Sequence, residues 1–206
     1  MKTLLISIIL LIFKFSFADV NQVLQQYSKS KAIQADIIKT DFKKTLGLTK
    51  ITNGNLKYTG GKINILFTGD KKTEIIYNGV KLWIIEYPDL DFDPKGKRKV
   101  TEVSGTKPIL GQQLVELFQK PKQFLKKFKF LSEKNNIVIF ESKPIDKGAQ
   151  NFKIEIDTKN KIIQSIQFTD DVQTETRIEF VKTLFLKKVP QEIFEYKRKK
   201  DDEAVQ

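Results

Sequence analysis

The residue types that most often carry chemistry are either missing from this sequence or placed in turns. It has neither histidine nor cysteine, which excludes a Ser-His-Asp triad, a Cys-His pair, a disulfide and a thiol-attached lipid. Acidic side chains cluster at Asp89, Asp91 and Asp93, and again at Asp170 and Asp171. Carboxylates can bind a metal ion, but both clusters lie in predicted turns, where Asp is favoured for local hydrogen bonds. We therefore expect no metal, no cofactor and no enzymatic activity.

An apolar stretch raises a different possibility. The segment NGVKLWIIEYPDL, residues 78–90, contains the run Leu82-Trp83-Ile84-Ile85. A strand directs alternate side chains to opposite faces, so this strand is apolar on both. Its second face must be covered either by more protein or by a bound apolar molecule.

The first eighteen residues have the pattern of a secretory signal peptide. Lys2 precedes the apolar run LLISIILLIF, residues 4–13, and the segment FSFA ends in the small residue Ala18. The alternative, a membrane anchor, is disfavoured because the run is too short to span a bilayer and Lys14 interrupts it. We expect a mature chain that begins at Asp19 and is exported to a bacterial periplasm.

The chain is strongly basic. Removal of residues 1–18, which contain Lys2 and Lys14, lowers the formal net charge from +12 to +10. Export argues against a nucleic-acid partner, and the lysines are spread over nearly every segment. This indicates a lysine-rich solvated surface, with weak attraction to anionic lipid as the alternative.

Hydrophobic periodicity predicts one domain over residues 19–206 that is mostly antiparallel sheet. A first amphipathic helix carries Val20, Val23, Leu24 and Tyr27 at helical spacing. Alternating segments separated by Gly and Asn turns then predict eleven strands. Their expected bounds are 36–46, 48–58, 62–68, 73–78, 81–87, 97–103, 127–133, 136–142, 151–158, 161–169 and 174–184.

Two segments depart from this alternation. A helical insert begins at Pro108, carries apolar residues at helical spacing and is interrupted by Pro121. The last ten residues, 197–206, have no apolar period, and we expect a frayed terminus. Eleven such strands form a large curled sheet with a hollow on one face, which a few short helices would fill incompletely.

The order of these parts resembles the periplasmic lipoprotein carriers of Gram-negative bacteria, the LolA family. The resemblance covers nearly the whole mature chain and rests on five segments in the family order. They are GNLKY at 54–58, YNGVKLWIIEYP at 77–88, GTKPILGQQLVELF at 105–118, KIEIDTKNKIIQSIQFTD at 153–170 and VPQEIFEYK at 189–197.

This resemblance implies an α+β fold, an unclosed eleven-strand half-barrel with a lid of short helices over a hydrophobic face. It implies that the hollow binds the acyl chains of lipoproteins released by an inner-membrane ABC transporter and delivers them to an outer-membrane acceptor lipoprotein. Such a carrier is a monomer and changes no covalent bond.

The site residues follow from the same parts of the chain. The cavity-lining candidates are Ile63, Ile65, Phe67, Trp83 and Ile85, and the lid candidates are Leu110, Leu114, Leu117 and Phe118. Taken singly, each of these residues is better explained as an ordinary core residue, and the set supports a cavity more strongly than any one member.

One departure from the family concerns the lid latch. The family has an Arg-Pro pair where this sequence has Gly60-Gly61, and Lys62 is the nearest cation. Lys62 is therefore the candidate latch, although it lacks the planar fork of Arg. The alternative functions are an envelope-sensing domain on the same half-barrel and an exported protein- or glycan-binding sheet.

Overall fold

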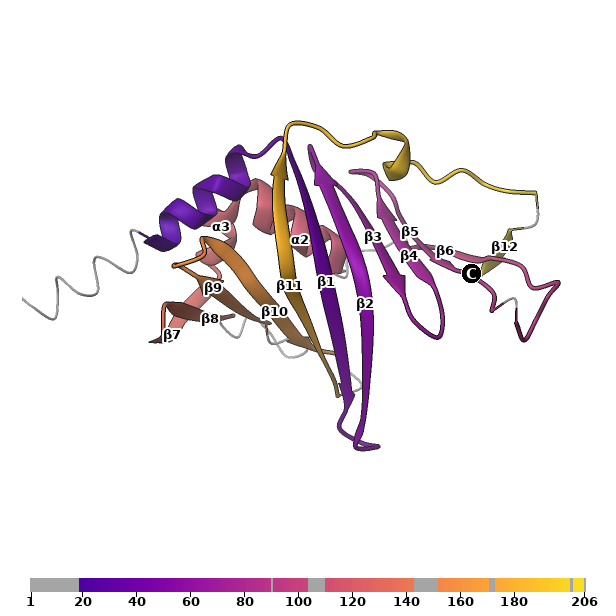
Figure 1. Ribbon diagram of the computed structural model, residues 1–206, viewed down its shortest axis with the longest axis horizontal. Helices are drawn as coiled ribbons and strands as arrows, with labels where there is room; N and C mark the ends of the chain where they lie inside the picture. Colours follow the sequence, from indigo (N-terminus) through magenta and orange to yellow (C-terminus); the bar gives the residue numbers. More distant parts are fainter. Residues whose placement is uncertain are drawn as a thin grey trace, which may run out of the picture.

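A computed structural model of the protein describes residues 19–89, 91–103, 110–142, 152–170, 173–200 and 202–205 (Figure 1). The predicted signal peptide, residues 1–18, lies outside them. Helix occupies residues 19–29, α2 spans Leu110–Gln119, α3 spans Pro121–Leu125, and the short 3₁₀ helix η1 spans Glu192–Phe194. The strands are β1 Ala32–Lys43, β2 Leu48–Thr59, β3 Lys62–Thr68, β4 Thr73–Tyr77, β5 Leu82–Glu86, β6 Lys99–Val103, β7 Phe128–Lys134, β8 Ile137–Ser142, β9 Phe152–Asp157, β10 Ile162–Thr169, β11 Thr174–Leu186 and β12 Glu203–Val205.

All twelve strands belong to one unclosed sheet in the order β12-β6-β5-β4-β3-β2-β1-β11-β10-β9-β8-β7. Every neighbouring pair is antiparallel except β12 with β6. The eleven predicted strands are present, and short links join most of them as antiparallel neighbours require. The half-barrel prediction is confirmed, with one strand more than expected.

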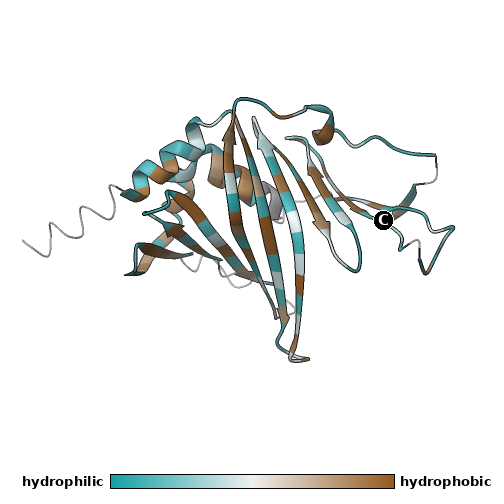
Figure 2. Ribbon diagram, in the orientation of Figure 1, coloured by the Kyte–Doolittle hydropathy of each residue, from teal (hydrophilic) through white to brown (hydrophobic). Residues whose placement is uncertain are grey.

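The two faces of the sheet have different covers. The N-terminal helix and α2 pack on one face, which we call the inner face, and residues 187–196 pack on the opposite, outer face (Figure 1). The predicted apolar stripe of the N-terminal helix is confirmed, because Val20, Val23, Leu24 and Tyr27 are all buried in the inner-face core. Figure 2 shows apolar and polar residues alternating along the central strands, as a sheet with two different faces requires.

The C-terminal tail is ordered against the sheet, so the expectation of a frayed terminus at 197–206 is wrong for its described part. Arg98 donates two hydrogen bonds to the Asp202 carboxylate, each 2.7 Å long, and β12 then pairs with β6. The Asp202 side chain is 3% exposed. Its burial raises the pKa, but hydrogen bonds from the Lys199 backbone, Tyr196 and Arg98 outweigh this, so the pKa of Asp202 is lowered. A charged pair between distant segments leaves no apolar period in the sequence, which is why the pattern missed it.

Candidate functional site

The inner face of the central strands is a continuous apolar surface. Strand registers place Ile63 beside Tyr58 and Tyr77, and Ile65 beside Leu56 and Ile75. Ile63 and Ile65 are fully buried. Since β3 alternates, Phe67 lies on the same face as these two residues, so the three predicted side chains share one face of the strand.

Phe67 fits against the sheet because the neighbouring residue on β2 is glycine. A Cβ atom at Gly54 would lie 2.9 Å from the Phe67 ring and 2.9 Å from the Leu66 carbonyl oxygen. On the other side of Gly54, Ile37 would lie 3.2 Å from the same Cβ. A larger residue at this position would displace the ring, so the GNLKY glycine shapes the lining.

Helix α2, the predicted lid, packs over this apolar surface. Leu114, Leu117 and Phe118 are buried in the inner-face core. The Phe118 ring stacks on Tyr27 at 5.4 Å and meets Tyr58 edge-on at 5.2 Å. Leu110 is the first residue of α2, and its side chain lies outside the described part of the structure. The hollow, which we expected to be incompletely filled, is occupied here by the side chains of α2.

The apolar lining ends at a polar cluster toward the β1–β2 turn. Lys39 lies with its ammonium 5.6 Å from the centroid of the Phe67 ring and donates to Asp41 at 2.6 Å. Thr176 on β11 donates to the other Asp41 oxygen at 2.7 Å. The ion pair is partly buried, with side chains 28% and 16% exposed. The inner face therefore has an apolar part under α2 and a charged part beyond Phe67.

Trp83 and Ile85 do not belong to this lining, so their prediction as cavity residues alongside Phe67 is corrected. Trp83 pairs with Ile76, whereas the inner-face residue Tyr77 pairs with Leu82. Trp83 and Ile85 therefore form a separate outer-face cluster with Ile76 and Val100. Sequence alone could not assign the face, because β5 is apolar at successive positions.

The cover over the Trp83 side is protein. Tyr196 of the C-terminal segment lies 5.6 Å from the Trp83 ring, and the indole nitrogen donates to Glu102 at 3.2 Å. The sequence allowed either more protein or a bound apolar molecule over the second apolar face of β5. The structure shows protein there, because the C-terminal segment packs on this side of the strand.

Within the described residues, Lys62 pairs with the outer-face segment and not with α2, which argues against its predicted role as the latch. Its ammonium lies 3.6 Å from a carboxylate oxygen of Glu195 on the outer-face segment. Among the described residues of α2, Gln119 makes a polar contact with the sheet, because its side chain interacts with the Tyr58 hydroxyl. The Gly61 backbone also interacts with this hydroxyl, while burial raises the pKa of Tyr58.

The Gly60-Gly61 turn makes room for this contact. Both glycines have a positive φ, +51° and +84°. A Cβ at Gly61 would collide with the Gln119 amide, whereas a Cβ at Gly60 would meet open space. Sequence reasoning missed Gln119, because a single glutamine at a helix end carries no signal. The glycine pair was the detectable feature.

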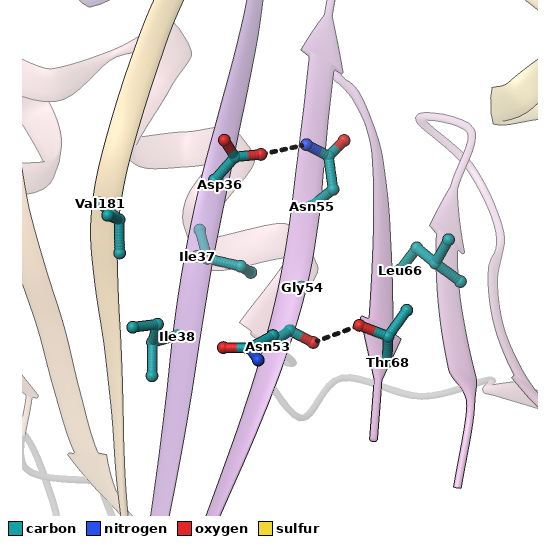
Figure 3. A pocket seen from close by; sticks show the side chains of 9 residues that line it. All are labelled: Asp36, Ile37, Ile38, Asn53, Gly54, Asn55, Leu66, Thr68 and Val181. Carbon is teal, nitrogen blue, oxygen red and sulfur yellow. Dashed lines mark hydrogen bonds between the residues drawn. The ribbon is translucent and has the colours of Figure 1, made fainter. Parts of the chain in front are cut away.

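A second surface feature is a shallow outer-face groove of about 380 Å³ across β11, β1, β2 and β3. Figure 3 shows its two polar contacts: Asn55 donates to Asp36 at 2.9 Å, and Thr68 donates to the Asn53 carbonyl at 3.4 Å. Ile38, Leu66 and Val181 supply its apolar side chains. It lies on the face opposite Phe67 and is separate from the covered lining.

The acidic clusters form turns, as predicted. The Asp91 backbone donates to the Asp89 side chain at 3.1 Å, and the Thr174 backbone donates to the Asp170 side chain at 2.7 Å. Asp171 lies outside the described residues. Across the described ranges, no three His, Cys, Asp or Glu side chains gather closely enough to hold a metal ion. No helix in those ranges has both the length and the apolar character needed to cross a bilayer.

The described chain is thus an unclosed, mostly antiparallel half-barrel with an apolar inner face under short helices. The family model described as outer membrane lipoprotein carrier protein LolA matches residues 28–197. The chain belongs to the LolA family. No curated protein matches it in sequence.

Several solved structures match this chain at low identity. A LolA superfamily protein from Nitrosomonas europaea is 11% identical over 86% of this chain and 97% of its own, with a TM-score of 0.42. An uncharacterized conserved protein from Thermus thermophilus is 8% identical over 90% and 98%, with a TM-score of 0.48. The Pseudomonas aeruginosa MucA/MucB complex matches at 9% identity over 82% of this chain and 56% of that chain, with a TM-score of 0.40. The family assignment rests on the family model.

Proposed function

We propose that this protein carries the acyl chains of lipoproteins from the inner to the outer membrane of a Gram-negative envelope. The observation that carries the proposal is the continuous lining of Ile63, Ile65 and Phe67 under apolar side chains of α2. Aliphatic and aromatic side chains offer contact area to an acyl chain without demanding fixed polar partners. Family membership supports the same cargo.

A carrier must also release what it binds. Each buried methylene contributes about 0.8 kcal/mol, so complete enclosure of several acyl chains would be effectively irreversible. Binding is therefore partial, and acyl chains replace the α2 side chains in the hollow. In this exchange one apolar surface substitutes for another, which keeps the net free energy small.

One feature of α2 favours this exchange. The side-chain oxygen of Gln113 is buried and has no hydrogen-bond partner among the described residues. A buried unsatisfied carbonyl costs about 1–3 kcal/mol, and opening the lid would return it to water. The closed lid is thus weaker than its apolar contacts alone imply.

The proposed route sets the location and the partners. The signal peptide delivers a monomeric carrier to the periplasm, an inner-membrane ABC transporter loads it, and an outer-membrane acceptor lipoprotein receives the cargo. The chain performs no covalent chemistry in this scheme. The alternative functions, envelope sensing and protein or glycan binding, require no acyl chain on the inner face.

The test is photo-crosslinking in cells with a benzophenone amino acid at position 67 or 83. Both native side chains are buried aromatics, 5% and 7% exposed, but they lie on opposite faces. We expect acylated lipoprotein at position 67 and only intramolecular products at position 83. No acylated product at position 67 while the releasing transporter is active would reject the carrier function.

A further inference from the structure

The tip of the β1–β2 hairpin carries exposed aliphatic side chains. Leu46 is 64% exposed, Leu48 59% and Ile51 67%. Three such residues within a segment of six are unusual on a solvated surface, where exposed apolar residues are normally scattered singly. The tip projects beyond the neighbouring strands at the lower edge of the sheet (Figure 1).

The three side chains surround the tip. Ile51 pairs with Thr40 and lies on the outer face, whereas Leu48 pairs with Lys43 and lies on the inner face. Leu46 is in the turn between the strands. A flat protein partner would contact only one side of such a tip, but a fluid apolar medium can surround all of it.

The same segment is basic. Residues 42–51 contain Lys43, Lys44 and Lys50 and no acidic residue. Lys44 pairs with Glu175 at 2.6 Å, and the exposed Lys50 side chain lies 3.6 Å from Asp70. Exposed pairs of this kind are weak and can be exchanged for lipid phosphates. The formal net charge of the chain from Asp19 onward, +10, adds long-range attraction to an anionic surface.

We propose that this tip is a membrane-docking element that inserts Leu46, Leu48 and Ile51 into the surface of a bilayer containing anionic phospholipid. Aliphatic residues beside lysines match the two layers of such a surface, acyl chains and phosphates. A second copy of the chain is a poorer occupant, because stable pairs bury about 800 Å² per partner, far more than three side chains offer.

The hairpin tip lies next to the polar end of the inner face, so docking of the tip also positions that face. Along the inner face of β1 the residues run from Ile37 in the apolar lining through Lys39 and Asp41 to Lys43 at the tip. Docking therefore holds the polar end of the inner face next to the bilayer. The inference does not depend on the carrier function, since the tip lies outside the lining.

The experiment uses the chain from Asp19 onward, which contains every described residue. Because the sequence has no cysteine, Thr45→Cys gives a single site for an environment-sensitive NBD label. The probe is a phosphatidylcholine vesicle with or without phosphatidylglycerol. We expect a blue shift and co-flotation with phosphatidylglycerol vesicles that decrease with added salt.

The decisive variant is Leu46→Asn/Leu48→Asn/Ile51→Asn, and the matched control is Val80→Asn, which alters an 84% exposed residue before β5. We expect at least about a tenfold loss of vesicle binding in the triple variant and none in the control. All four side chains are exposed, so folding, monitored by circular dichroism, is unaffected.

Three outcomes would overturn the proposal: no vesicle binding by the parent chain, equal binding by the triple variant, or equal loss in the control. Concentration-dependent self-association that the triple variant abolishes would assign the tip to a second copy instead. Loss of docking with retained acyl crosslinking at position 67 would leave the carrier function intact.

Discussion

Truncation of the Phe118 side chain tests whether α2 is a movable lid or a fixed helix of the core. Phe118 is fully buried on α2, stacks on Tyr27 and meets Tyr58 edge-on. Removing a buried ring of this kind costs about 3–5 kcal/mol. If α2 opens as a unit, the truncation lowers the free energy of opening α2 and leaves the free energy of unfolding of the sheet unchanged.

The local cost translates into a measurable loss of amide protection. Since about 1.4 kcal/mol corresponds to a factor of ten, Phe118→Ala should speed hydrogen exchange of α2 by roughly a hundred- to several-thousand-fold. The amides of β1, β2 and β11 should keep their parent rates. An apolar dye such as N-phenylnaphthylamine should also bind more tightly, because the variant exposes the lining.

Phe140→Ala is the matched control. Phe140 is 5% exposed and belongs to the same core, but it lies on β8 and contacts Phe130 on β7. Its truncation should lower the free energy of unfolding of the whole sheet without selective exchange in α2. If Phe118→Ala instead accelerates exchange in α2 and the sheet equally and leaves dye binding unchanged, α2 is an integral core helix and the lid argument fails.

Three further predictions concern the two covers. Gly61→Ala, which pushes the α2 amide away from its tyrosine partner, should increase dye binding more than Gly60→Ala, whose Cβ meets open space, in a fluorescence titration. Gln113→Leu removes a buried unsatisfied oxygen and should raise the melting temperature while slowing dye uptake in stopped-flow traces; faster uptake would contradict it. Because the folded pKa of Asp202 is lowered, its contribution is present above the unfolded pKa of about 3.9 and lost as pH falls through the folded value. Acidification, or Asp202→Asn at neutral pH, should therefore red-shift the emission of Trp83, the single tryptophan. An unchanged spectrum would refute the idea that Asp202 holds the C-terminal segment over Trp83.

Most of the sheet could be predicted because its signals are local. Alternation in segments such as residues 152–157 depends only on which side chains face the core, and the Gly and Asn turns fix where each strand ends. The residues at Asn135 and Asn136 adopt positive φ, 52° and 66°, as a tight hairpin between β7 and β8 requires. These features need no knowledge of distant parts of the chain.

The site was predictable only in part, because the position of some of its residues depends on contacts with distant segments of the chain. The lining of Ile63, Ile65 and Phe67 follows from one alternating strand. The face of Trp83 depends on which element covers it, and that element is the C-terminal segment, more than a hundred residues later in the sequence. A strand that is apolar at successive positions is compatible with either assignment, so periodicity cannot decide between them.

The two covers of the sheet differ in the chemistry that holds them, and the proposed carrier function requires that one of them opens. The outer cover is held by the partly buried bidentate pair of Arg98 and Asp202, and removing one partner leaves the other charge uncompensated. In the described part of the chain, the inner cover is held by apolar contacts of Phe118 and by the Gln119 amide, and the buried Gln113 side-chain oxygen has no partner there. An acyl chain can replace apolar contacts but cannot replace an ion pair. Under the proposed carrier function, cargo competes with α2 and leaves the C-terminal segment in place, so saturating acyl ligand should accelerate exchange in α2 while Trp83 emission stays constant.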